Sequence, residues 1–306
     1  MTTWVNRIFM KLLSHRVKHR SERFILVVAI LSYLIHLSLI FLGDQGFLSL
    51  DSNFLTNPIA AIYTPFSFIL VYEVYLLIFF LPKSISYYIG KQYEIITLIV
   101  IRRIFKDLSK IELSSNWFEI KSDLQFTYDV ATSLALFFLI YLFYRNIGVR
   151  NLTTASNLID LEENVQRFVT LKRGIAILLV PILIFLASYT LFKWILAIFN
   201  KNLNGITAFN DINNIFFDEF FTVLIIVDVL LLLASFFYSD KFPTIIRNSG
   251  FVISTILLKI SFSVEGRVNN ILIVSAVLFG FLILVIHNLF ERDKLKESQK
   301  SNFFKP

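Results

Sequence analysis

Two acidic residues lie deep inside long apolar stretches of the chain, where a carboxylate needs a special environment. Glu73 lies within FSFILVYEVYLLIFF, and Asp228 lies within FFTVLIIVDVLLLLASFF. A carboxylate at such depth is costly, so it faces a protein interior or a water-filled cavity and pairs with a base or binds a proton. The chemistry that fits such acids is proton binding or ion passage. The competing interpretation is structural, because a buried polar group can also hold helices together.

Basic residues that could neutralise these acids follow on the next apolar segment in each case. Lys91 or Arg103 is the expected partner of the first acid, and Lys259 is the expected partner of the second. Glu94 lies three residues after Lys91, on the same face of a helix, and this spacing predicts a local pair. We therefore expect an intramembrane polar site built from Glu73, Lys91, Glu94, Arg103, Asp228 and Lys259.

The composition and the apolar runs place these residues in a membrane. The chain is 56% hydrophobic and only 17% charged, whereas soluble domains carry about 25% charged residues. A membrane-spanning helix needs about 20 mostly apolar residues. Segments of suitable length lie at 24–43, 61–81, 130–147, 174–198, 216–238 and 268–290, and two shorter ones lie at 85–105 and 250–264. We expect an all-α, polytopic membrane helix bundle with six to eight spans.

The order of the apolar segments indicates two similar halves. Each half has a long span, a long span with an acid, a short helix that ends in a base, and another long span. The alternative is chance, because chains rich in Leu, Ile and Phe align easily. The predicted organisation is a basic amphipathic N-terminal helix (1–23), a first membrane half (24–147), a polar linker helix (148–173), a second membrane half (174–290) and a polar C-terminal tail (291–306).

Whether segment 85–105 crosses the membrane decides the topology. If it crosses, there are eight membrane helices in two parallel halves, and the linker is cytoplasmic. If it lies in the interface, there are six spans, the halves are inverted as in many transporters, and the linker is outside. The bases at the ends of the linker are Arg145, Arg150, Lys172 and Arg173. Because bases near short loops favour the cytoplasm, we expect the crossing.

The N-terminal tail combines positive charge with an apolar side. Its bases Arg7, Lys11, Arg16 and Lys18 lie apart from the apolar residues, a pattern typical of a helix on an anionic leaflet. The alternative is that the tail only prolongs the first span. The expected partners are the lipid bilayer and anionic lipid head groups, and a homo-oligomer or a larger membrane complex stays open. We expect a bacterial inner (cytoplasmic) membrane protein with both termini in the cytoplasm, and no nucleic-acid binding.

Motifs for enzymatic chemistry are missing from the sequence. The chain has no Cys and only four His, and no two His have metal-ligand spacing. No Ser/His/Asp arrangement and no Gly-rich phosphate loop occurs. We therefore expect no metal, no cofactor and no enzyme activity.

One stretch resembles a known membrane module. Glu73, followed by GKQYEIITLIVI with Glu94 near its start, resembles helices two and three of the four-helix voltage-sensor module of cation channels. The resemblance covers part of the first half, and it implies that Glu73 and Glu94 are internal counter-charges. The next span, DVATSLALFFLIYLFYRN, lacks the arginine at every third position that senses voltage. The second half has no acid that matches Glu94. The resemblance therefore implies a similar four-helix shape and not voltage sensing.

Two functions follow as hypotheses. The first is a channel- or transporter-like path, or a proton-sensitive site, that uses Glu73 and Asp228. The second is a non-catalytic membrane scaffold or an accessory subunit of a membrane complex, whose acids only pack helices. The sequence identifies no transported species.

Overall fold

The computed structural model describes residues 2–45, 60–108, 121–147, 163–199, 205–238, 242–264 and 266–303. These residues form helices and no strand. A short helix α1 (Thr2–Leu12) precedes eight longer ones within the described ranges: α2 (His15–Asp44), α4 (Tyr63–Phe80), α5 (Ile85–Leu108), α6 (Lys121–Asn146), α8 (Glu163–Phe199), α9 (Gly205–Tyr238), α10 (Phe242–Phe262) and α11 (Gly266–Phe303). A 3-10 turn, η1 (Ala60–Ile62), leads into α4. The predicted all-α, polytopic helix bundle is confirmed.

Six of the described helices are long and apolar enough to cross a membrane. Helix α4 is apolar over a shorter stretch, Thr64–Phe80. Helix α10 corrects the prediction of a short segment at 250–264, because it begins at Phe242 and has 21 residues. The prediction missed its first turns because Arg247 and Asn248 interrupt the apolar run. Asn248 is buried within the bundle, so these turns do not need an apolar sequence.

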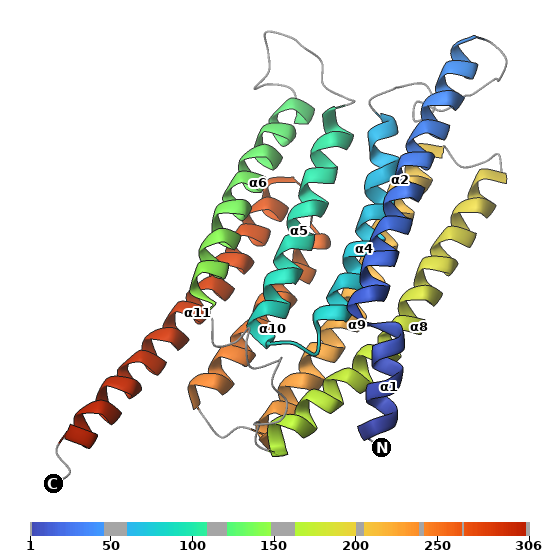
Figure 1. Ribbon diagram of the computed structural model, residues 1–306. Helices are drawn as coiled ribbons and strands as arrows, with labels where there is room; N and C mark the ends of the chain where they lie inside the picture. Colours follow the sequence, from blue (N-terminus) through green and yellow to red (C-terminus); the bar gives the residue numbers. More distant parts are fainter. Residues whose placement is uncertain are drawn as a thin grey trace.

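Helix α5 contains the segment whose crossing was uncertain. It runs along the length of the bundle between α4 and α6, and it packs against both (Figure 1). Its polar residues Gln92, Thr97 and Arg102 are buried. A helix that is covered by other helices does not need an apolar surface on every side, which explains why its apolar run is short. This arrangement supports the eight-helix alternative over an in-plane helix.

The helices pack in the same order in the two parts of the chain. In the first part α2 contacts α4, α4 contacts α5, and α5 contacts α6. In the second part α8 contacts α9, α9 contacts α10, and α10 contacts α11. Contacts of α6 with α11, α4 with α8 and α5 with α10 join the two parts. Glu73 lies on α4 and Asp228 on α9, the second helix of each part, which supports the hypothesis of two repeated halves.

The N-terminal segment predicted at 1–23 is divided between two helices. Ser14 caps α2, and its hydroxyl accepts a hydrogen bond from the backbone N–H of Val17 at 3.3 Å. Residues 15–23 therefore prolong the first span, and only α1 forms a separate helix. A Ser cap of this kind satisfies a free N–H group at a helix start.

The polar segments expected between and after the halves also continue into long helices. Residues 163–173 form the first turns of α8, which runs on to Phe199, while the rest of the predicted linker, 148–162, lies outside the described residues. Helix α11 continues through the predicted C-terminal tail to Phe303. Charged residues end the apolar stretch but not the helix, because Lys, Arg and Glu are good helix formers.

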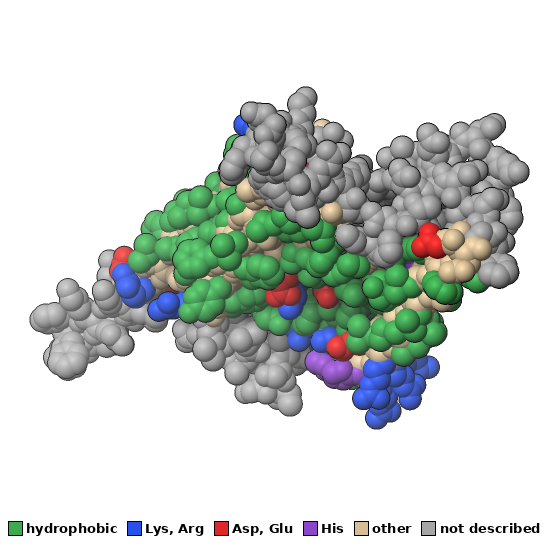
Figure 2. All heavy atoms as spheres, turned by 90° about the horizontal axis from the view of Figure 1, so that it is seen from above, with side chains coloured by type: hydrophobic (Ala, Val, Ile, Leu, Met, Phe, Trp, Pro, Cys, Tyr) green, Lys and Arg blue, Asp and Glu red, His purple; other side chains and the backbone are tan. Residues whose placement is uncertain are grey.

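Large apolar side chains cover the outside of the bundle. Hydrophobic side chains make up most of the described surface in the view of Figure 2. On α6, for example, Leu134, Phe138 and Tyr141 are each at least 60% exposed. Soluble monomers rarely expose apolar patches of more than a few hundred Å². Lipid is the solvent that suits this surface.

Candidate functional site

Polar side chains of α5 meet polar side chains of the second half along a line that we call the α5 seam. The α5 seam consists of Gln92, Tyr93 and Arg103 on α5 and their partners Asp228, Ser254, Thr255, Asn269 and Asn270 on α9, α10 and α11. Such groups inside a membrane protein are normally hydrogen-bonded to each other. The α5 seam is therefore a polar part of the contact between the two parts of the chain.

The centre of the α5 seam holds the carboxylate of Asp228. Gln92 Nε2 donates a hydrogen bond to Asp228 Oδ2 at 3.0 Å, and Thr255 Oγ1 donates to Gln92 Oε1 at 2.9 Å. Asp228 is only 5% exposed. The Gln92 amide thus connects α5 to both α9 and α10, and its bond to the acid is strong only while Asp228 is ionised.

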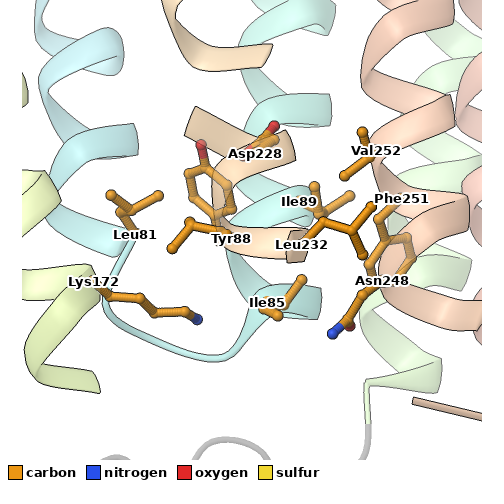
Figure 3. A pocket seen from close by; sticks show the side chains of 11 residues that line it. Leu81, Ile85, Tyr88, Ile89, Lys172, Asp228, Leu232, Asn248, Phe251 and Val252 are labelled. Atoms are coloured by element: carbon orange, nitrogen blue, oxygen red, sulfur yellow. The ribbon is translucent and has the colours of Figure 1, made fainter. Parts of the chain in front are cut away.

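A small cavity lies beside Asp228. Lys172, Asn248 and Tyr88 line it together with apolar side chains (Figure 3). Its volume of about 20 Å³ is enough for roughly one water molecule. The Tyr88 hydroxyl is buried beside Asp228 and Gln92, but no hydrogen bond of good geometry joins it to either side chain. One water in this cavity would give that hydroxyl a partner.

The base that lies near Asp228 differs from the predicted one. Lys172 of α8 lines the same cavity as Asp228, and its Nζ donates to the backbone oxygen of Lys83 at 3.0 Å. Lys259 does not line this cavity. In an antiparallel helix pair, residues at equal distances from the connection face each other, which places Val252 and not Lys259 near Asp228. An alignment of the two halves by sequence does not show at which height residues of neighbouring helices meet.

Glu73 lies on the other side of α5. The predicted Lys91–Glu94 pair is confirmed, with Lys91 Nζ and Glu94 Oε2 2.6 Å apart, and Glu73 lies near this pair. Gln92 contacts Asp228 on the opposite side of the helix. The two acids therefore flank α5 at a similar height, and they do not share one cavity.

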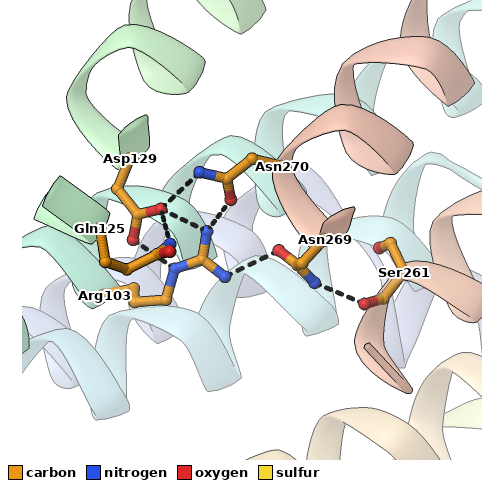
Figure 4. Close-up of polar contacts among 6 residues, drawn as sticks. All are labelled: Arg103, Gln125, Asp129, Ser261, Asn269 and Asn270. Carbon is orange, nitrogen blue, oxygen red and sulfur yellow. Dashed lines mark hydrogen bonds and ion pairs between the residues drawn. The ribbon is translucent and has the colours of Figure 1, made fainter. Parts of the chain in front are cut away.

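Arg103, one of the two bases predicted for Glu73, pairs with another acid. Its guanidinium forms an ion pair with Asp129 of α6, and its Nη1 donates to Asn269 Oδ1 at 2.7 Å (Figure 4). Asn270 Nδ2 also donates to Asp129 Oδ1 at 2.7 Å. The prediction missed Asp129 because it directly precedes the apolar segment at 130–147. The signal that could have revealed this network is the adjacent pair Asn269 and Asn270 at the start of the last span.

The predicted membrane-surface bases lie on α1 and the start of α2. Arg7, Lys11 and Arg16 are exposed, whereas Lys18 is half-buried. The Lys18 ammonium lies 5.5 Å from the centroid of the Phe80 ring. Among the described residues, no group of His, Cys, Asp and Glu side chains could hold a metal ion.

The fold and the apolar helices define the protein as an α-helical, multi-pass membrane protein. Comparison of the chain with protein-family models, with curated proteins and with solved structures finds no match.

Proposed function

We propose that the protein is transporter-like and binds a proton at Asp228, in the contact between its two halves. The observation that carries this proposal is the hydrogen bond from Gln92 to the buried Asp228, beside a cavity that also holds Lys172 and the buried hydroxyl of Tyr88. Intramembrane acids of this kind mark ion and proton pathways in pumps and transporters.

Protonation of Asp228 would change how the halves hold each other. The Gln92 bond is charge-assisted only for the ionised acid, and such bonds are roughly twice as strong as neutral ones. Loss of the charge therefore weakens the link between α5 and α9. A proton that binds one packing arrangement better than another shifts the population between the two.

The size of the cavity favours a proton over a larger cargo. Room for about one water is too little for an organic solute in this conformation. A single water could hydrogen-bond to a polar side chain that lines the cavity.

The second candidate function is a membrane scaffold or an accessory subunit. The small cavity and the complete pairing of Asp129 with Arg103, Gln125 and Asn270 favour it, because both suit acids that only fix helix packing. In that case the protein would carry no protons by itself, and its partners would be other membrane subunits.

Proton flux into liposomes tests the proposal. We expect purified wild-type protein to conduct protons, measured with a pH-sensitive dye inside the vesicles, and Asp228→Asn to stay folded but lose the flux. The matched control is Glu219→Gln, which removes an exposed acid from the same helix and should keep the flux. We expect Glu73→Gln to reduce the flux, because it occupies the corresponding helix of the first half.

The opposite result would favour the scaffold. A wild-type protein without flux of protons or common ions, together with an equally stable Asp228→Asn variant, contradicts the transport proposal. Thermal unfolding of each variant in detergent separates loss of function from loss of fold.

A further inference from the structure

A second group of charged side chains lies where the chain turns from α4 into α5. Three ammonium groups converge on the ring of Phe80. Their Nζ atoms lie 4.9 Å (Lys83), 5.3 Å (Lys91) and 5.5 Å (Lys18) from the ring centroid. They come from the turn, from α5 and from α2. Folding thus gathers like charges that lie far apart in the sequence.

Only one of the three lysines has an acidic partner. Glu94 neutralises Lys91 at 2.6 Å, whereas Lys18 and Lys83 form no ion pair within 4.0 Å among the described residues. Glu22, one turn after Lys18, lies 3.4 Å from His19. Burial, followed by the repulsion from Lys18 and Lys91, lowers the pKa of Lys83. Two half-buried cations therefore lie together without a direct ion pair among the described residues, with Glu73 as a more distant acid near Lys18.

The surroundings of the two cations favour an amphipathic ligand. Phe79 and Phe80 form an aromatic floor under both ammonium groups. Farther along α2, Leu26 is 46% exposed and, of the exposed apolar side chains of this helix, lies nearest to the side that carries Lys18. A ligand with an anionic head and an apolar tail could contact the lysines and this surface together.

We propose that Lys18 and Lys83 bind the phosphate of an anionic lipid head group, whose acyl chains lie along α2. Basic pockets between membrane helices bind such head groups. This proposal does not depend on proton transport. The proposed site is defined by two helices and the turn between α4 and α5, in contrast to a general attraction of the basic N-terminal tail to lipid. Arg16 and Arg20 do not belong to this site.

Thermal unfolding of the full-length protein in detergent tests the site. We expect phosphatidylglycerol to raise the unfolding midpoint of the wild type, and phosphatidylcholine and inorganic phosphate to leave it unchanged. In the double variant Lys18→Gln/Lys83→Gln, the apparent affinity for phosphatidylglycerol should fall by about tenfold or more. The control Arg16→Gln/Arg20→Gln removes the same charge from two exposed positions of α2, and it should keep the affinity.

The other outcomes contradict the proposal in distinct ways. Equal stabilisation by inorganic phosphate would identify a free-anion site in place of a lipid site. An equal loss of affinity for phosphatidylglycerol in the control variant would show that net charge alone, and not this site, causes the effect. If the double variant does not fold, Lys83→Gln alone is measured, and an unchanged affinity in that variant overturns the proposal.

Discussion

Asp129 and Asp228 are both buried carboxylates, but their neighbours give them different roles. Asp129 is bound by the Arg103 guanidinium and by two amides, so its charge is compensated and its position is defined. Asp228 accepts a hydrogen bond from one amide and lies beside the hydroxyls of Tyr88 and Thr255, but among the described residues no base forms an ion pair with it, and Lys172 donates its bond to a backbone oxygen. A carboxylate with incomplete compensation can gain a proton more readily. This contrast is why we place the proton site at Asp228.

The α5 seam also contains a very close helix contact, which leads to a prediction at Gly280 of α11. A Cβ atom at this position would lie 1.7 Å from the Tyr93 hydroxyl. Gly280→Ala must therefore displace Tyr93 and break its 2.8 Å hydrogen bond to Ser254. We expect this overpacking to cost about 1–3 kcal/mol, measured as a lower unfolding midpoint in detergent.

Two further variants make the Gly280 prediction specific. Tyr93→Phe removes the closest atom, so Gly280→Ala should cost less in that background than in the wild type. Gly174→Ala on α8 is the control, because a Cβ there has nothing within 4 Å and should not lower the midpoint. A Gly280→Ala protein as stable as the control would contradict the close contact.

At the scale of elements, α5 connects the two halves although its sequence is the least typical of a span. It is not among the six helices of the described chain that qualify as spans by length and apolarity. Its polar residues instead meet α9, α10 and α11. A helix can cross a membrane with such residues when they face protein. Whether α5 crosses the membrane decides the orientation of every helix that follows it.

Single cysteines test the crossing, since the chain has none of its own. We expect an impermeant thiol reagent to label Lys11→Cys and Ser156→Cys from the same side of the membrane, and Asn116→Cys from the opposite side. The reason is that, in the eight-helix topology, α5 crosses the membrane before Asn116 and α6 crosses back before Ser156. Labelling of Ser156→Cys on the side opposite to Lys11→Cys would favour six spans with inverted halves.

At the scale of the whole molecule, the two halves have the same order of packed helices but different polar interiors. Helix α4 carries Glu73 near the Lys91–Glu94 pair, whereas α9 carries Asp228 beside Gln92 from the other half. Duplication followed by divergence of the interior would produce this pattern. The arrangement gives one half the hydrogen-bond donor and the other half the acid.

The hypothesis of a repeat predicts a superposition. In an experimentally determined structure, α2, α4, α5 and α6 should superpose on α8, α9, α10 and α11, with Glu73 and Asp228 at matching positions. The physical reason is that similar segment lengths and polar positions impose similar helix packing. Acids that fall at unrelated heights after superposition would contradict the duplication.

The sequence by itself determined the class of protein and the order of its helices. Both depend on local composition: a long apolar run such as that of α2 or α11 must form a helix in lipid, because every backbone group has to be paired within the segment. The local pair of Lys91 and Glu94 was predictable for the same reason, since its spacing is set within one helix.

Only the tertiary structure decided which side chains meet between helices. The rotation of each helix about its axis and its height beside its neighbours depend on packing over the whole molecule. Arg103 therefore meets Asp129 and not Glu73, and Lys172 is the base that lines the cavity beside Asp228. Gln92, Tyr88 and Asp129 were missed because two are uncharged and the third lies at the edge of a span. Their importance comes from burial against another helix, which no single segment encodes.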